Sequence, residues 1–172
     1  MAPHEIEEAL KGMVVLVDTR EQDTARLRVR LKDMKCEHER CKLDVGDYSA
    51  KVPVNGEWLT LNVAIERKMD LDELAQCYCN GRKRFEREFE RAQKAGAKIY
   101  LLIENATWED AYMGNYRSKM SPQALIASIL AWLSRYRCQL IFCRQRTSGR
   151  LIYDILYREA REYLERTMLD EG

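Results

Sequence analysis

Two carboxylates and an ammonium gather in a predicted β-hairpin, a set that could hold a divalent cation and act on a phosphate group. Strand-like runs over residues 45–54 and 58–65 are joined by Asn55-Gly56, a pair typical of tight hairpin turns. Side chains alternate between the two faces of a strand, so Glu66 and Lys68 project from the same face if the second strand continues. The sequence therefore predicts an acid and a base side by side.

The register of this hairpin predicts a second acid nearby. A two-residue loop pairs Val54 with Glu57, and counting back sets Asp47 opposite Ala64. Asp47 is then a diagonal neighbour of Glu66, at about 7–8 Å between backbones. Two carboxylates at this separation can converge on a hard cation such as Mg²⁺. The alternative is a solvated strand face that carries a salt bridge without any catalytic role.

Three motifs in a fixed order surround the hairpin. They are Val17-Asp18-Thr19-Arg20-Glu21, then Val45-Gly46-Asp47-Tyr48, then Ile65-Glu66-Arg67-Lys68 followed by Asp72. Together they resemble the nuclease domain of XPF-type structure-specific endonucleases, within the restriction-endonuclease-like PD-(D/E)XK superfamily. The step Asn80-Gly81-Arg82 is similar to a helix break of that family. The resemblance implies a restriction-endonuclease-like fold with a metal-dependent phosphodiesterase site.

The resemblance also implies roles for single residues. Asp47 and Glu66 would bind Mg²⁺ or Mn²⁺, with the Arg67 carbonyl as a further ligand. Lys68 would position the attacking water. Asp18 would be a nearby carboxylate that serves a second metal or braces the first.

Supporting roles follow from the same resemblance. Arg20 and Arg67 would contact phosphate or brace the acids, and Glu21 and Asp72 would orient these basic groups. The expected substrate is branched, flap or fork DNA, in repair or recombination. Family nucleases work as dimers, so a homodimer is expected.

Other functions stay open at the sequence level. One alternative is a Holliday-junction-resolving or restriction-like nuclease on the same fold. Another is a catalytically inactive DNA-binding or dimerising partner, against which the intact Asp47, Glu66 and Lys68 argue. A third is a scaffold that retained only the fold.

Two basic segments are candidates for contact with DNA phosphates. Arg82, Lys83 and Arg84 stand at a predicted helix start, where cations oppose the helix dipole unless an anion is near. Residues 135–150 hold five arginines and no acidic residue, and Arg144 and Arg146 lie centrally among them. We expect these segments to bind DNA; ordinary basic surface is the alternative.

Composition limits the remaining possibilities. The 172 residues carry a net charge of +1, which gives no hint of a nucleic-acid partner by itself. No stretch is apolar enough to span a bilayer, and the N-terminus is acidic. A cytoplasmic location is therefore expected, associated with the nucleoid in a prokaryote or virus, or a nuclear one in a eukaryote. The six cysteines have spacings unlike those of zinc sites, so reduced and mostly buried thiols are expected. No small-molecule cofactor and no membrane partner are expected.

Hydrophobic periodicity predicts an α/β fold with a central mixed β-sheet flanked by helices. One domain is expected over residues 1–172, with a motif-bearing core over 13–104, a C-terminal helix–strand–helix over 121–167 and neither a helix-hairpin-helix nor a helicase module. Strands are predicted over 13–17, 36–43, 45–54, 58–65, 98–104 and 138–143. Helices are predicted over 5–11, 23–34, 71–79, 82–95, from 122 to about 136, and from 148 to about 166, with an irregular stretch over 105–120.

Overall fold

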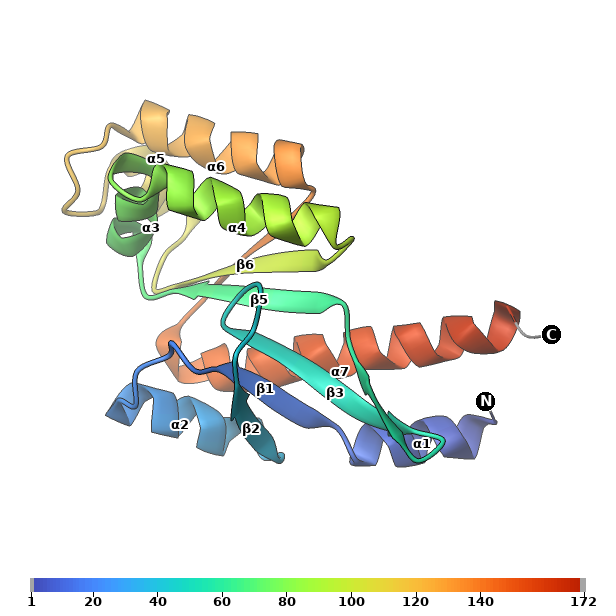
Figure 1. Cartoon of the computed structure of the whole chain (residues 1–172). Helices are drawn as coiled ribbons and strands as arrows, with labels where there is room; N and C mark the ends of the chain where they lie inside the picture. Colours follow the sequence, from blue (N-terminus) through green and yellow to red (C-terminus); the bar gives the residue numbers. More distant parts are fainter. Residues whose placement is uncertain (1, 171–172) are drawn as a thin grey trace. The chain divides into compact units, whose positions relative to one another are not determined.

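A computed structural model describes residues 2–170 of the chain, and these form two compact units (Figure 1). The first unit holds residues 2–43, 47–63 and 149–170. The second unit holds residues 44–46 and 64–148.

The first unit combines three helices with four strands. Its elements are α1 (Pro3–Lys11), β1 (Val14–Asp18), α2 (Ala25–Met34), β2 (His38–Cys41), β3 (Tyr48–Val54), β4 (Glu57–Thr60) and α7 (Gln145–Asp170), the last of which belongs to this unit from Gly149 onward. Strand β1 pairs with β2 in parallel and with β3 antiparallel, and β3 pairs with β4 antiparallel. The sheet of this unit is therefore mixed, as predicted.

The β3–β4 hairpin has the turn that its sequence predicts. Val54 pairs with Glu57, and the two turn residues Asn55 and Gly56 have φ values of 50° and 81°. A two-residue turn with both φ angles positive matches the twist of the flanking strands, which explains the Asn-Gly pair.

Helix α7 packs closely against α2 because position 149 has no side chain. A Cβ atom at Gly149 would lie 2.5 Å from the carbonyl oxygen of Arg30 and 2.9 Å from its Cα. Ser148 and Gly149 are both buried. The glycine thus sets the approach of the two helices.

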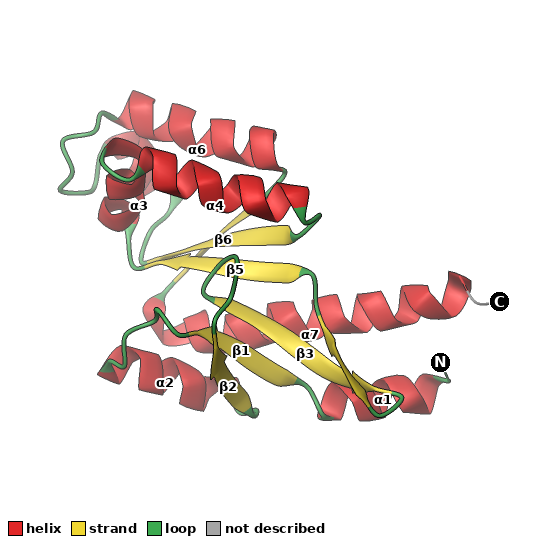
Figure 2. Ribbon diagram, in the orientation of Figure 1, coloured by secondary structure: helices red, strands yellow, loops and turns green. Residues whose placement is uncertain are grey.

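The second unit holds three strands and four helices. They are β5 (Val63–Lys68, in this unit from Ala64), α3 (Leu71–Cys79), α4 (Arg82–Lys94), β6 (Lys98–Glu104), α5 (Trp108–Met113), α6 (Pro122–Tyr136) and β7 (Gln139–Cys143). Strand β6 lies between β5 and β7 and pairs with β7 in parallel. Helices α3, α4 and α6 pack on one another, and α3 and α4 also contact β6. Figure 2 shows α3, α4 and α6 together on one side of β5 and β6.

Aromatic side chains form the centre of the second unit. Trp132 of α6 is fully buried and contacts Tyr78, Phe85 and Tyr136, with ring centroids 4.9–5.7 Å apart. Phe89 follows Phe85 by one helical turn, and their rings meet edge to face at 4.8 Å. These rings fix α3, α4 and α6 behind the strand that carries Glu66 and Lys68.

The fold class is confirmed, and two local predictions are wrong. The strand predicted over 58–65 is two strands, because β4 ends at Thr60 and β5 begins at Val63. The β3–β4 pairs have the counted register from Val54–Glu57 to Lys51–Thr60, and Asp47 precedes β3, so its place opposite Ala64 stays a prediction. The stretch predicted as irregular contains α5, which Thr107 caps by accepting a hydrogen bond from the Asp110 N–H.

Within residues 2–170, no helix combines the length and apolarity needed to cross a membrane. All six cysteines are free thiols, but only Cys138 is buried, whereas Cys79 is exposed and the other four are half-buried. The prediction of reduced thiols fits this state, and the prediction that most are buried is wrong.

Candidate active site

Asp18 ends β1 in a fully buried position and holds Arg20. Its Oδ1 accepts hydrogen bonds from the Arg20 N–H and Nε, both at 2.7 Å, and its Oδ2 accepts from Arg20 Nη2 at 3.1 Å and from the Leu43 N–H at 2.8 Å. Burial alone would raise the pKa of Asp18, but these hydrogen bonds and the guanidinium lower it below its ordinary value. Asp18 is therefore an ionised carboxylate whose oxygens already accept from four donors. This arrangement suits a residue that holds Arg20 in position.

The Gly46-Asp47 step is anchored on both sides. The Asp18 N–H donates to the Asp47 carbonyl oxygen at 2.9 Å, which joins the first two motifs through the backbone. Gly46 has φ +73°, and a Cβ there would lie 2.9 Å from the Cβ of Ala64. Only glycine fits both this left-handed conformation and this close approach. The motif glycine thus has a structural cause, and the Asp47 side chain is half-buried.

Glu21 is held by a buried arginine that the motifs do not include. Arg30 is only 3% exposed, its Nε donates to the Tyr48 hydroxyl at 3.1 Å, and its Nη2 lies 3.6 Å from Glu21 Oε2. The Tyr48 hydroxyl donates to the same Glu21 oxygen at 3.1 Å. Arg30 shares the buried face of α2 with Leu27 and Met34. The sequence signal for this role of Arg30 was a charged residue on the apolar face of a predicted helix.

Glu66 and Lys68 meet inside the second unit, as the strand alternation predicts. Lys68 Nζ donates to Glu66 Oε1 at 2.7 Å, and the two side chains are 11% and 7% exposed. The Lys68 ammonium also lies 5.3 Å from the centroid of the Phe85 ring. Burial raises the pKa of the Cys77 thiol above its ordinary value, and the Lys68 charge opposes that rise. The ammonium is therefore fixed on a strand, against a helix and an aromatic wall.

Glu88 of α4 joins this pair, and sequence reasoning missed it. Burial raises the pKa of Glu66 strongly; the Lys68 ammonium opposes this rise, and the nearby Glu88 carboxyl adds to it. Glu88 Oε1 also accepts a hydrogen bond from the Gly46 N–H at 3.1 Å. Glu88 thus touches the residue that directly precedes Asp47. Its sequence signal was that it lies three residues after Phe85 and so on a neighbouring part of the helix surface. The sequence interpretation had assigned this Glu/Arg-rich stretch to a solvated helix face.

Two of the predicted supporting residues, Arg67 and Asp72, are held by ion pairs within the second unit. Arg67 donates to Glu104 at 3.1 Å, where the carboxylate is 1% exposed. Asp72 accepts from the Arg117 and Ser118 N–H groups at 2.8 and 2.7 Å, and from Arg117 Nε at 3.2 Å. Asp72 therefore anchors the loop between α5 and α6, and its expected role of orienting Arg20 or Arg67 stays a prediction.

The predicted DNA-binding residues are all exposed. Lys83 and Arg84 open α4 at the surface, and Arg144 and Arg146 flank the first residue of α7. Arg82 is partly engaged, with Nε 3.5 Å from Glu86 and its guanidinium 5.1 Å from the Trp132 ring. The helix starts therefore present cations to solvent, where an anion would be stabilised.

In the described part of the chain, no group of three or more His, Cys, Asp or Glu side chains is arranged to hold a metal ion. The donor set that the second unit does bring together is Glu66 with Glu88, beside the single ammonium of Lys68. The metal ligands named from the sequence stay a prediction.

The arrangement described so far, a mixed α/β fold with acidic and basic motif residues at strand ends, is that of a restriction-endonuclease-like domain. The family model of the ERCC4 domain matches residues 17–155, and the chain belongs to this family. No curated protein matches the sequence.

Solved structures give the same fold. XPF from Aeropyrum pernix is 18% identical with a TM-score of 0.59, over 83% of this chain and 64% of that one. XPF from Aeropyrum pernix in complex with DNA is 19% identical with a TM-score of 0.61, over 87% and 65%. The chain thus spans slightly less than two thirds of these structures.

Proposed function

We propose that this chain is a metal-dependent DNA endonuclease that hydrolyses phosphodiester bonds, with a preference for branched, flap or fork DNA. The observation that carries the proposal is the buried contact between Glu66 and Lys68, at 2.7 Å, in a chain of the ERCC4 domain family. A buried acid–base pair is costly to keep for stability alone, because apolar residues would fill the space as well.

The buried Glu66 is of the ligand type that a hard divalent cation binds, although no group of three such ligands is preformed among the described residues. Carboxylate oxygens are the ligands that Mg²⁺ and Mn²⁺ prefer. Glu66 is 5% exposed and has a second carboxyl, Glu88, beside it and one ammonium to balance both. A cation bound there would offset this repulsion, and we assign Asp47, Glu66 and the Arg67 carbonyl as its ligands.

A bound Mg²⁺ would polarise a nonbridging phosphate oxygen. Lys68 orients the attacking water by a hydrogen bond and balances the charge of Glu66. Asp18 keeps Arg20 in place through three hydrogen bonds, so that the guanidinium can meet a phosphate oxygen. Glu88 positions the Gly46-Asp47 step through the Gly46 N–H.

The test is a cleavage assay on labelled flap, fork, four-way-junction, single-stranded and duplex DNA, with Mg²⁺, Mn²⁺ or EDTA. We expect metal-dependent cleavage that Asp47→Ala and Glu66→Gln both abolish. The matched control is Asp44→Ala, which removes an exposed carboxylate from the same turn and is expected to leave cleavage unchanged.

Absence of metal-dependent cleavage on every substrate would refute the nuclease proposal and favour an inactive DNA-binding partner. Cleavage that survives Asp47→Ala would refute the assigned site. Cleavage of four-way junctions alone would favour the Holliday-junction-resolving alternative over the flap and fork preference.

A further inference from the structure

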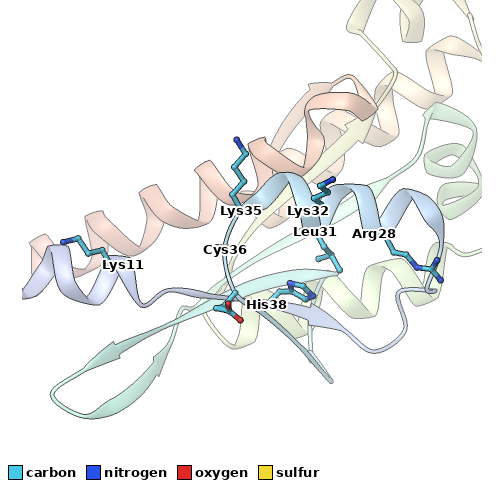
Figure 3. Close-up of a pocket in the computed structure, with 8 residues that line it drawn as sticks. Lys11, Arg28, Leu31, Lys32, Lys35, Cys36 and His38 are labelled. Carbon is cyan, nitrogen blue, oxygen red and sulfur yellow. The ribbon is translucent and has the colours of Figure 1, made fainter.

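The first unit carries a hollow of about 620 Å³ whose lining is mostly basic, and none of the nuclease motifs contributes to it. It is called the basic groove below. Its residues come from the end of α1, from α2 and from the segment that leads into β2, and they are Lys11, Arg28, Leu31, Lys32, Lys35, Cys36, Glu37 and His38. Figure 3 shows Lys32 and Lys35 at the end of α2, with His38 on the strand beside them.

The charge of the basic groove is one-sided. Four cations line it against one carboxylate, Glu37. Arg28 is paired with Asp23 at 2.9 Å, but both side chains are about two-thirds exposed, so the pair contributes little and can exchange partners. Among the side chains that the structure describes, residues 2–167, no ion pair is found for Lys11, Lys32 or Lys35. A bound anion would be attracted by all of these cations.

The basic groove lies at the opposite end of β1 from the motif carboxylate. His38 pairs with Val15 near the start of β1, whereas Asp18 pairs with Cys41 at its end. The two pairs are three residue steps apart along the strand, roughly 10 Å. A ligand in the basic groove therefore does not occupy the place of Asp18 and Arg20.

A polyanion fits this lining better than a small molecule. Small ligands need buried polar groups that converge from several directions, whereas the cations here are exposed side chains spread over two helices. Arg28 and Lys32 are one helical turn apart, roughly 6 Å along the axis. That rise is close to the advance of two nucleotides along one DNA strand, at about 3.4 Å each.

We infer that the basic groove is a second contact surface for the phosphodiester backbone of DNA, used in addition to the nuclease motifs. The inference rests on the proposed function, because it assigns an additional part of the same substrate to the first unit. Its contacts are with phosphates and not with base edges, so it adds affinity without sequence preference.

The test measures DNA binding in EDTA, where cleavage is not needed, as a function of salt. We expect Lys32→Ala/Lys35→Ala to weaken duplex binding roughly tenfold or more at 0.1 M salt and to reduce the slope of log K against log salt by about 1–2, since each lost phosphate contact removes about 0.9. Glu37→Gln is expected to act in the opposite direction and strengthen binding. The control Lys94→Ala/Lys119→Ala removes the same charge from exposed positions of the second unit and should change the slope less.

Wild-type affinity and salt slope in the Lys32→Ala/Lys35→Ala variant, with unchanged far-UV circular dichroism, would overturn the inference. So would an equal loss in the control variant, because it would show only an effect of net charge. Failure of the proposed function is separate, since it is read from cleavage by the wild-type chain with Mg²⁺. A larger loss of affinity in Lys32→Ala/Lys35→Ala for single-stranded than for duplex DNA would support the basic groove as a contact for a single DNA strand.

Discussion

At the residue scale, Glu88 links parts of the molecule that the motifs leave separate. Its carboxylate accepts from the Gly46 N–H and lies against Glu66. We expect Glu88→Ala to lower cleavage roughly 10–100-fold, the range usual for groups that orient metal ligands. Glu88→Gln keeps an acceptor for Gly46 and should recover much of this loss. The measurements are kcat and the Mn²⁺ concentration for half-maximal rate.

A merely structural role for Glu88 predicts a different pattern. Both variants would then lower thermal stability in parallel with activity and leave the Mn²⁺ requirement unchanged. An equal loss of cleavage activity in Glu88→Gln and Glu88→Ala would show that the hydrogen bond from the Gly46 N–H does not account for the effect of Glu88.

Asp72 makes a pH-dependent contribution to stability. Partial burial raises its pKa, but hydrogen bonds from Ser118 and Arg117 lower it below the ordinary 3.8. The contribution is fully present above the unfolded value, near pH 4, and is lost as the pH falls through the lower folded value. We expect Asp72→Asn to cost about 1–2 kcal/mol near neutral pH, and urea unfolding should show this gap closing below about pH 4.

The companion variant is Arg117→Ala, in which the two backbone N–H donors to Asp72 remain. Its cost should be smaller, because the Arg117 side chain is 88% exposed. A gap between Asp72→Asn and wild type that stays constant down to pH 2 would contradict the assignment.

Residue types in the motifs were readable from sequence, but their partners were not. Glu66 and Lys68 were predicted to share a face, because alternation is a property of a single strand. Arg67 with Glu104, Asp72 with Arg117, and Glu21 with Arg30 join residues 9 to 45 positions apart. Such pairs depend on packing of whole elements, which local periodicity does not contain.

At the element scale, Gly149 determines how closely α7 approaches α2. Alanine in a helix interior is ordinarily favoured over glycine by about 1 kcal/mol. Here the added Cβ would lie 2.5 Å from the Arg30 carbonyl oxygen, so a backbone must move. We expect Gly149→Ala to destabilise the protein by about 1–3 kcal/mol in spite of the helix preference. Urea and thermal unfolding measure the difference.

Gly81→Ala is the matched control for this prediction. Its Cβ would lie 3.5 Å from the nearest atom, an ordinary contact, at the start of α4. The expected cost is below about 1 kcal/mol. Gly149→Ala that unfolds no earlier than Gly81→Ala would show that α7 can shift at little cost.

Most element positions followed from the sequence, and the two failures have different causes. The predicted ranges of α3 and β6 are those of the structure, because a cap or a glycine bounds each apolar run. The split between β4 and β5 was missed, since alternating Leu59, Leu61, Val63 and Ile65 continue across it. Helix α5 was missed because six residues give too little period to detect.

At the scale of the whole molecule, the net charge of +1 divides unevenly between the units. Counted over the full sequence, with residues 1, 171 and 172 assigned to the first unit, that unit has 14 Lys and Arg against 17 Asp and Glu, a net −3, and the second has 15 against 11, a net +4. Most of the positive field therefore belongs to the unit that carries Glu66 and Lys68. The low overall sum hides a polarised molecule.

This division predicts where charge reversal weakens DNA binding most. We expect Arg144→Glu/Arg146→Glu, at exposed positions of the second unit, to lower affinity for duplex DNA at least tenfold at 0.1 M salt, because phosphate contacts are lost and repulsion is added. Arg158→Glu/Arg166→Glu reverses the same charge on exposed positions of α7 in the acidic unit and should have a clearly smaller effect. Fluorescence anisotropy in EDTA measures both. Equal losses would mean that DNA responds only to the total charge of the chain, and the assignment of Arg144 and Arg146 to phosphate contacts would be wrong.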